Sequence, residues 1–138
     1  MSFVYFTDRD PGKAFPEILR SNGLTVERHR DHFAHNTPDE IWLEAVGKRR
    51  WIALTHDQRI RYKPNERDAV MRNNVGLLVI IGAVPFPDLA RAFVTSLPVV
   101  EQFLEEHRSP FIAKVYRRTP AETARCGPGP GRVEEWYP

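Results

Sequence analysis

The chain has 138 residues, a length typical of one domain built around a single core. Its hydrophobic fraction of 41%, charged fraction of 28% and formal net charge of +2 are ordinary for a globular protein. No stretch approaches the roughly 18 apolar residues that cross a bilayer, and the amino terminus lacks a secretory-signal pattern. We therefore expect a cytoplasmic protein with no membrane partner. Cys126 is its only cysteine, which excludes an internal disulfide.

Predicted strands and helices alternate along the chain. The clearest helix start is Thr37-Pro38-Asp39-Glu40, which has the pattern of a capping box with Pro at the first helical position. Apolar spacing and Gly or Pro punctuation indicate the other elements. In the first half we expect a strand at 4–6, a helix through 15–19 that ends at Asn22-Gly23, a strand at 24–26, a polar loop at 29–36, a helix up to Gly47 and a strand at 51–54. The second half predicts a loop from 58, a helix from about 65, a strand at 77–81, a helix from about 88 to 107 that Pro98 could interrupt, and a strand at 111–116.

This alternation predicts an α/β fold of right-handed βαβ units. A mostly parallel central sheet would be covered by helices on both faces, as a three-layer α/β/α sandwich. Residues 1–118 would form this single domain. Residues 119–138 contain four prolines and three glycines. We expect them to form a flexible tail that does not pack on the domain.

Acidic residues recur where predicted parallel strands end. Asp8 and Asp10 follow the first strand and Asp57 follows the third, while Asp39 and Glu40 open a helix whose amino terminus points to the same edge. Carboxylates held close together repel, and a divalent cation removes that conflict. Mg²⁺ binds a few carboxylate oxygens together with water and substrate phosphate, and it can activate that water. We predict a Mg²⁺ site that draws its ligands from these five acids, with Asp39 or Glu40 as the helix ligand and with Asp8, Asp39 and Asp57 as the catalytic residues.

Some of these acids also have structural explanations. Asp10 precedes Pro11-Gly12 and suits a turn, and Asp39 and Glu40 suit the first turn of a helix. Asp8 and Asp57 end apolar strands, where packing requires no acid. His32 and His35 lack further ligands at zinc spacing, so a loop without metal is the better interpretation.

Basic residues concentrate in one stretch. Between Lys48 and Arg72 there are eight Lys or Arg and only three acids. This excess suits a polyanion, whose phosphates supply most of the binding free energy, and it equally suits a solvated basic surface.

Three short motifs together resemble those of the PIN-like nucleases, most closely the toxin branch called VapC. They are Phe6-Thr7-Asp8-Arg9-Asp10, Thr37-Pro38-Asp39-Glu40 and Leu54-Thr55-His56-Asp57, and the resemblance spans residues 3 to 117. It implies a compact nuclease that cuts RNA with Mg²⁺ or Mn²⁺ and is blocked by an antitoxin protein encoded beside it. By position, Asp8 and Asp57 match the family's strand-end acids, and Asp39 or Glu40 matches its helix acid. The family's fourth acid has no clear counterpart, although Asp10 could replace it.

The resemblance also gives the basic stretch a role. Arg59, Arg61 and Lys63 follow Asp57 and would hold the RNA backbone near the metal. Tyr62 would stack on a base, and Arg9 would be a further RNA contact. Phosphate contacts carry no sequence information, so the cognate RNA cannot be inferred.

Two other functions are compatible with the sequence. A receiver-like phospho-acceptor domain also places acids after the first and third strands, but it needs a lysine after the last strand, and Lys114 falls inside the predicted one. In a non-catalytic module for nucleic acid or protein, the acids would serve only turns and caps. A homodimer is also compatible with the sequence, because Leu89, Phe93, Leu97 and Phe103 could pack against a partner or into the core.

Overall fold

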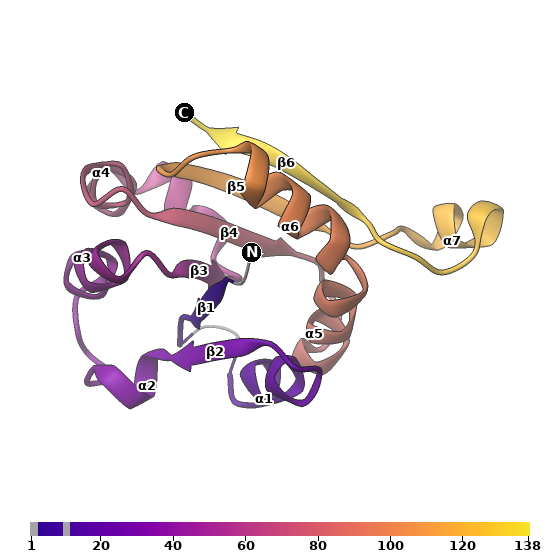
Figure 1. The fold of residues 1–138 in the computed structure, drawn as a ribbon, viewed down its shortest axis with the longest axis horizontal. Helices are drawn as coiled ribbons and strands as arrows, with labels where there is room; N and C mark the ends of the chain where they lie inside the picture. Colours follow the sequence, from indigo (N-terminus) through magenta and orange to yellow (C-terminus); the bar gives the residue numbers. More distant parts are fainter. Residues whose placement is uncertain (1–2, 10–11) are drawn as a thin grey trace.

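The computed structural model describes residues 3–9 and 12–138. The strands of these residues form one six-stranded sheet in the order β2-β1-β3-β4-β5-β6 (Figure 1). The first five strands are parallel, and β6 pairs antiparallel with β5. The strands are β1 (Val4–Thr7), β2 (Thr25–Arg28), β3 (Ile52–Thr55), β4 (Gly76–Ile81), β5 (Phe111–Tyr116) and β6 (Arg132–Tyr137).

Helices cover both faces of the sheet, which confirms the predicted α/β/α sandwich (Figure 1). Strand β4 shows why. Its Leu78 and Ile80 pack into one helical layer while Leu77 and Val79 pack into the other, as the twofold alternation of a strand requires. One layer contains α1 (Ala14–Ser21), α5 (Phe86–Thr95) and α6 (Leu97–Glu106), and the other contains α3 (Asp39–Arg49) and α4 (Pro64–Arg72). Three short helices connect the larger elements: α2 (His29–His32), the 3₁₀ helix η1 (Gln58–Tyr62) and α7 (Pro120–Cys126).

The prediction of a capping box at Thr37 is wrong. Pro38 keeps an extended ψ of 147°, so α3 begins at Asp39, one residue later than expected, and no side chain caps it. Glu40 is then the second helical residue, where it cannot make the reciprocal bond of a capping box. A capping box does form in α7, between Thr119 and Glu122.

The segment predicted as a polar loop at 29–36 begins with the short helix α2 instead. His29 is 1% exposed, and its ring packs against the rings of Phe6, Phe33 and Trp42. Since Phe6 and Trp42 are far from His29 in the sequence, local polarity could not reveal these contacts. The predicted interruption near Pro98 is confirmed, because α5 ends at Thr95 and α6 begins at Leu97.

The prediction that residues 119–138 form a flexible tail that does not pack is corrected by β6. This strand completes the sheet beside β5, and Val133 packs against the cluster that includes α6. The turn into it is tight, because a Cβ on Gly131 would lie 1.7 Å from the carbonyl oxygen of Tyr116. Proline and glycine are frequent in this segment, so its composition did not indicate the six consecutive strand residues near its end.

Three of the four residues that we considered for a homodimer lie in the core, and the fourth, Leu97, is partly buried and packs against it. Leu89 and Phe93 are 1% exposed and Phe103 is 7% exposed. Within the described ranges, no helix combines the length and the apolar character needed to cross a membrane.

Candidate active site

The strand order reverses between β1 and β3, since β2 lies beyond β1 and β4 lies beyond β3. In doubly wound sheets, ligands bind outside the carboxyl ends of the strands at this switch point. Asp8 directly follows β1, and Asp57 follows β3 after His56. The backbone N–H of Asp8 donates to the carbonyl of Leu54 at 3.1 Å, which ties the two strand ends together.

Asp8 is a largely buried carboxylate. Its side chain is 12% exposed. One of its oxygens accepts the backbone N–H of Arg9 at 2.7 Å, and the other accepts the hydroxyl of Thr55 at 3.2 Å. Burial, reinforced by the nearby negative charge of Asp39, raises the pKa of Asp8 to about 6 although Arg9 and Thr55 oppose the shift. This carboxyl therefore changes its protonation state near neutral pH.

Arg9 joins Asp8 to the start of α3. Its guanidinium donates to Asp39 at 3.0 Å, to the carbonyl of Thr37 at 3.2 Å and to the carbonyl of His35, and its Nε lies 3.8 Å from Asp8. The same oxygen of Asp39 accepts the indole N–H of Trp42 at 2.9 Å. The structure thus places Asp39 next to Asp8, with a cation between the two acids.

Asp57 has different surroundings. One of its oxygens accepts the backbone N–H and the Nε of Arg59, at 3.0 and 3.1 Å, and the other accepts the ammonium of Lys63 at 3.1 Å. Burial alone would raise the pKa of Asp57, but these hydrogen bonds and charges outweigh it and hold the pKa below its usual range. Asp57 also caps the 3₁₀ helix η1, so part of its role is structural.

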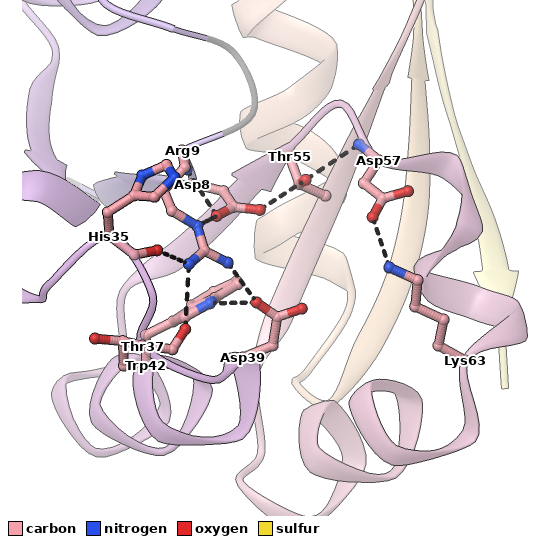
Figure 2. A network of polar contacts seen from close by, with 9 residues as sticks. All are labelled: Asp8, Arg9, His35, Thr37, Asp39, Trp42, Thr55, Asp57 and Lys63. Atoms are coloured by element: carbon pink, nitrogen blue, oxygen red, sulfur yellow. Dashed lines mark hydrogen bonds and ion pairs between the residues drawn. The ribbon is translucent and has the colours of Figure 1, made fainter.

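One continuous series of contacts connects the three acids (Figure 2). It runs from Asp39 through Arg9 to Asp8, and then through Thr55 to Asp57, whose backbone N–H donates to the Thr55 hydroxyl at 3.1 Å. In Figure 2 the Asp57 carboxylate points toward Lys63 and away from Asp8. The predicted catalytic acids therefore meet at one edge, but Asp57 stands apart from the other two.

A pocket of about 260 Å³ opens beside Asp8. Four cationic residues line it, namely Arg9, Lys13, Arg28 and Arg30. Lys13, Arg28 and Arg30 were not predicted as site residues, although Arg28 and Arg30 form a basic cluster where the second predicted strand ends, at the ligand-binding edge. Arg28 is held by Asp31 at 2.9 and 3.0 Å, whereas Lys13 and Arg30 are exposed. This pocket can receive an anionic ligand next to the acids.

The other predicted site residues that the structure describes are not part of the contacts that connect the three acids. Within the described part of the chain, Glu40 makes no hydrogen bond or ion pair with the other acids, and Tyr62 is 66% exposed beyond Lys63. His56 faces the carbonyl of Gly82 at 2.9 Å and the ring of Phe86. Asp10 and the side chain of Arg61 lie outside the described part of the chain.

Asp8, Asp39, Glu40 and Asp57, four of the five predicted metal ligands, do not form one carboxylate cluster. In residues 3–9 and 12–138, no group of three or more His, Cys, Asp or Glu side chains is arranged to hold a metal ion. Arg59 and Lys63 occupy the oxygens of Asp57, and Glu40 stays outside the network. The pair Asp8 and Asp39 does fit Mg²⁺ or Mn²⁺, because such ions often take only one or two carboxylates plus water and substrate phosphate. Burial is the main cause of the raised pKa of Asp8 and repulsion from Asp39 adds to it; a bound cation would favour the ionised carboxylate against both.

The geometry defines a class of protein, an α/β/α domain with an acidic site at the switch point of a parallel sheet. Residues 3–82, more than half of the chain, match the family described as "PIN like domain". The chain belongs to this family, whose members are commonly nucleases. Comparison with curated proteins and with solved structures finds no match.

The receiver-like alternative shares this strand order, so the order alone does not exclude it. A receiver needs its lysine beyond the last parallel strand. Lys114 instead pairs with Val79 within the sheet, and its ammonium lies 4.1 Å from the ring centroid of Trp136. The observed position of the lysine therefore favours a PIN-like domain.

Proposed function

We propose that this protein is a metal-dependent endoribonuclease that hydrolyses phosphodiester bonds of RNA at Asp8. The observation that supports this most is the buried Asp8 carboxylate, paired with Asp39 at the switch point and opening onto a cationic pocket. Membership of the PIN-like family adds independent support. No other group of acids in the described residues offers the same combination of burial and a cationic surface.

In this proposal Asp8 and Asp39 bind Mg²⁺ or Mn²⁺. When bound, the ion supplies an activated water and offsets the negative charge that develops on the scissile phosphate. Arg9 already lies between the two acids and donates to Asp39, so it holds them in place and compensates their charge. Thr55 orients Asp8 through its hydroxyl, which also accepts from the backbone of Asp57.

The cationic residues would hold the RNA on both sides of the acids. Lys13 and Arg30 line the pocket beside Asp8, and Arg59 and Lys63 surround Asp57 on the other side. Contacts of this kind fix the position of the sugar-phosphate backbone without identifying its sequence. Asp57 would then hold two cations of the RNA surface in place, and it would act on the metal site only indirectly.

We further propose that the nuclease is the toxin of a toxin–antitoxin pair. The support is the likeness of its three acidic motifs to VapC toxins, together with membership of the PIN-like family. The cognate antitoxin would cover the pocket beside Asp8 and exclude RNA. Strong expression should then arrest growth, and Asp8→Asn should relieve the arrest. Normal growth with abundant, catalytically active protein would contradict the toxin role.

The nuclease activity can be tested directly with purified protein and end-labelled single-stranded RNA, in Mn²⁺ and in chelator. We expect cleavage in Mn²⁺ by the natural chain and by Asp88→Asn, a matched change at an exposed acid on α5 that pairs with Arg91. Asp8→Asn and chelator should both abolish it. Cleavage by Asp8→Asn, or in chelator, at the rate of the natural chain in Mn²⁺ would contradict the proposal.

Thermal melting distinguishes the enzyme from a passive binding module. Mn²⁺ should raise the Tm of the natural chain, because an ion that binds only the folded state stabilises it. Asp8→Asn should lose this increase, while Asp88→Asn should keep it. A Tm that does not change when Mn²⁺ is added would favour the non-catalytic module.

A further inference from the structure

The strands β5 and β6 carry a group of aromatic and cationic side chains on the face opposite α6. On that face α3 and α4 pack with β1, β3 and β4 through buried residues such as Trp42, Ala53 and Val70. Farther along the sheet, Lys114 and Tyr116 of β5 are only partly buried, and Arg132 of β6 is exposed. This face is therefore accessible at its outer strands.

The aromatic rings on this face are arranged with cations. The ammonium of Lys114 lies 4.1 Å from the ring centroid of Trp136, and the guanidinium of Arg132 lies 4.1 Å from that of Tyr116. Tyr62 contacts Trp136 edge to face at 5.8 Å between centroids. We call these five residues the aromatic face: Tyr62, Lys114, Tyr116, Arg132 and Trp136.

Charge favours an anionic ligand on the aromatic face. Glu134 is opposite Lys114 in the strand register and lies 3.7 Å from Arg132, so it offsets part of the positive charge. Lys114 and Arg132 still outnumber it. Arg67 lies close by, with its guanidinium 5.1 Å from the ring centroid of Tyr137, and Asp68, 3.9 Å from its Nε, offsets part of its charge.

The aromatic face is continuous with the acidic site. Tyr62 ends η1, the short helix that begins immediately after Asp57. The next residue, Lys63, donates to Asp57 at 3.1 Å. A polyanion held by Lys63 would therefore meet Tyr62 next and then Trp136.

We propose that the aromatic face binds single-stranded RNA flanking the cleavage site. Bases stack on aromatic rings and on guanidinium planes, and cations between the rings contact the phosphates. Tyr62, with 66% of its surface exposed, offers such a ring, and the Arg132–Tyr116 pair offers a guanidinium plane. A duplex keeps its bases stacked inside, so this surface selects single strands. The inference rests on the proposed ribonuclease function, which it extends by a substrate class and by a role for β6.

The test is binding of fluorescent RNA, measured by anisotropy in chelator, where no cleavage occurs. One probe is a single strand of about 12 nucleotides, long enough to reach β6, and the other has about 3 nucleotides. Tyr62→Ala should weaken binding of the longer probe about tenfold, in line with the loss of one stacked base, and Tyr62→Phe should restore it. Arg132→Gln should weaken the longer probe about threefold and leave the shorter one unchanged.

Two exposed residues on α3 provide matched controls. Ile41→Ala removes another large exposed apolar side chain, and Lys48→Gln removes an exposed cation. Both should bind the longer probe as the natural chain does, and annealing the probe to its complement should remove the effect of Tyr62→Ala. Absence of binding by the natural chain, or equal losses in Ile41→Ala and Tyr62→Ala, would overturn the proposal. Cleavage without any Tyr62 effect would refute the aromatic face alone, whereas binding without cleavage in Mn²⁺ would refute the nuclease alone.

Discussion

The two halves of the acidic site differ in how their carboxylates are compensated. Asp8 is buried, has one guanidinium nearby and has a pKa raised to about 6, whereas Asp57 is held by Arg59 and Lys63 and has a lowered pKa. A carboxylate that contacts two cations gains less from a metal ion than a buried carboxylate with a single guanidinium nearby. The difference teaches that position at a strand end does not by itself make an acid a ligand. The charged groups that contact the carboxylate decide whether it can bind a metal ion.

The largest expected difference between the halves is in catalysis. Asp8→Asn should reduce the rate of RNA cleavage in Mn²⁺ at least about 100-fold, because it removes the buried carboxylate of the proposed metal pair. Asp57→Asn should reduce the rate only about tenfold, as expected for a residue that supports the site from outside. Single-turnover cleavage with saturating protein measures both. Equal losses in the two variants would remove the distinction between the halves.

Arg9→Ala should cause the next largest effect, a loss of folding free energy of about 2–4 kcal/mol. The change leaves Asp39 and the carbonyl groups of His35 and Thr37 without their common donor. Urea denaturation measures the loss. The control is Arg91→Ala, which removes an exposed ion pair to Asp88 and should cost below about 1 kcal/mol. A loss in Arg9→Ala no larger than in this control would show that the guanidinium does not hold the acids together.

The pH dependence of stability should have opposite signs in the two halves. Since the pKa of Asp8 is raised to about 6, its contribution is complete below its ordinary pKa of 3.8 and is lost as pH rises through 6, by about 2–3 kcal/mol. Asp8→Asn should therefore flatten the fall in stability between pH 4 and 6. The lowered pKa of Asp57 stabilises the fold above pH 3.8, and that stabilisation is lost as pH falls through the lowered value.

Urea denaturation at a series of pH values checks both signs. Asp57→Asn should leave the fall between pH 4 and 6 intact and should change only the acid end of the profile. If the stability of Asp8→Asn fell between pH 4 and 6 as much as that of the natural chain, the fall would come from another titrating group.

The smallest effect should come from Lys63→Gln. Losing this ammonium should raise the pKa of Asp57 and change the free energy of unfolding by below about 1 kcal/mol, since both side chains are partly exposed. NMR titration of the aspartate carboxyl carbons would follow the pKa. The titration of Asp8 should stay unchanged, and an equal shift at both acids would mean that the two halves act as one site.

The order of strands and helices was readable from the sequence because each element has its own periodicity. The buried strand Gly76–Ile81 and the pair of helices around Pro98 depend on local patterns of apolar residues and proline. The C-terminal strand was not readable in the same way. Its position depends on pairing with β5, and the composition of the preceding residues indicates disorder.

The site was predictable only in part. The rule for carboxyl ends of parallel strands brought Asp8 and Asp57 to one edge, and the start of α3 brought Asp39 there. The rule could not show that Arg9 reaches back between the acids, nor that Lys63 occupies Asp57, because side-chain pairing depends on the folded backbone. The rule also did not indicate whether Asp39 or Glu40 belongs to the site. In the structure, the indole N–H of Trp42 donates to Asp39 and not to Glu40.

The C-terminal strand also protects the sheet from self-association. Without β6, the edge of the sheet would be β5, with the sequence Phe-Ile-Ala-Lys-Val-Tyr and a row of unpaired backbone groups. A strand of this apolar and β-branched composition is a template for pairing with other chains. In β6, the charged residues Arg132, Glu134 and Glu135 now form the edge, and charges of this kind discourage such pairing. The segment whose composition predicted a flexible tail therefore protects the sheet against aggregation.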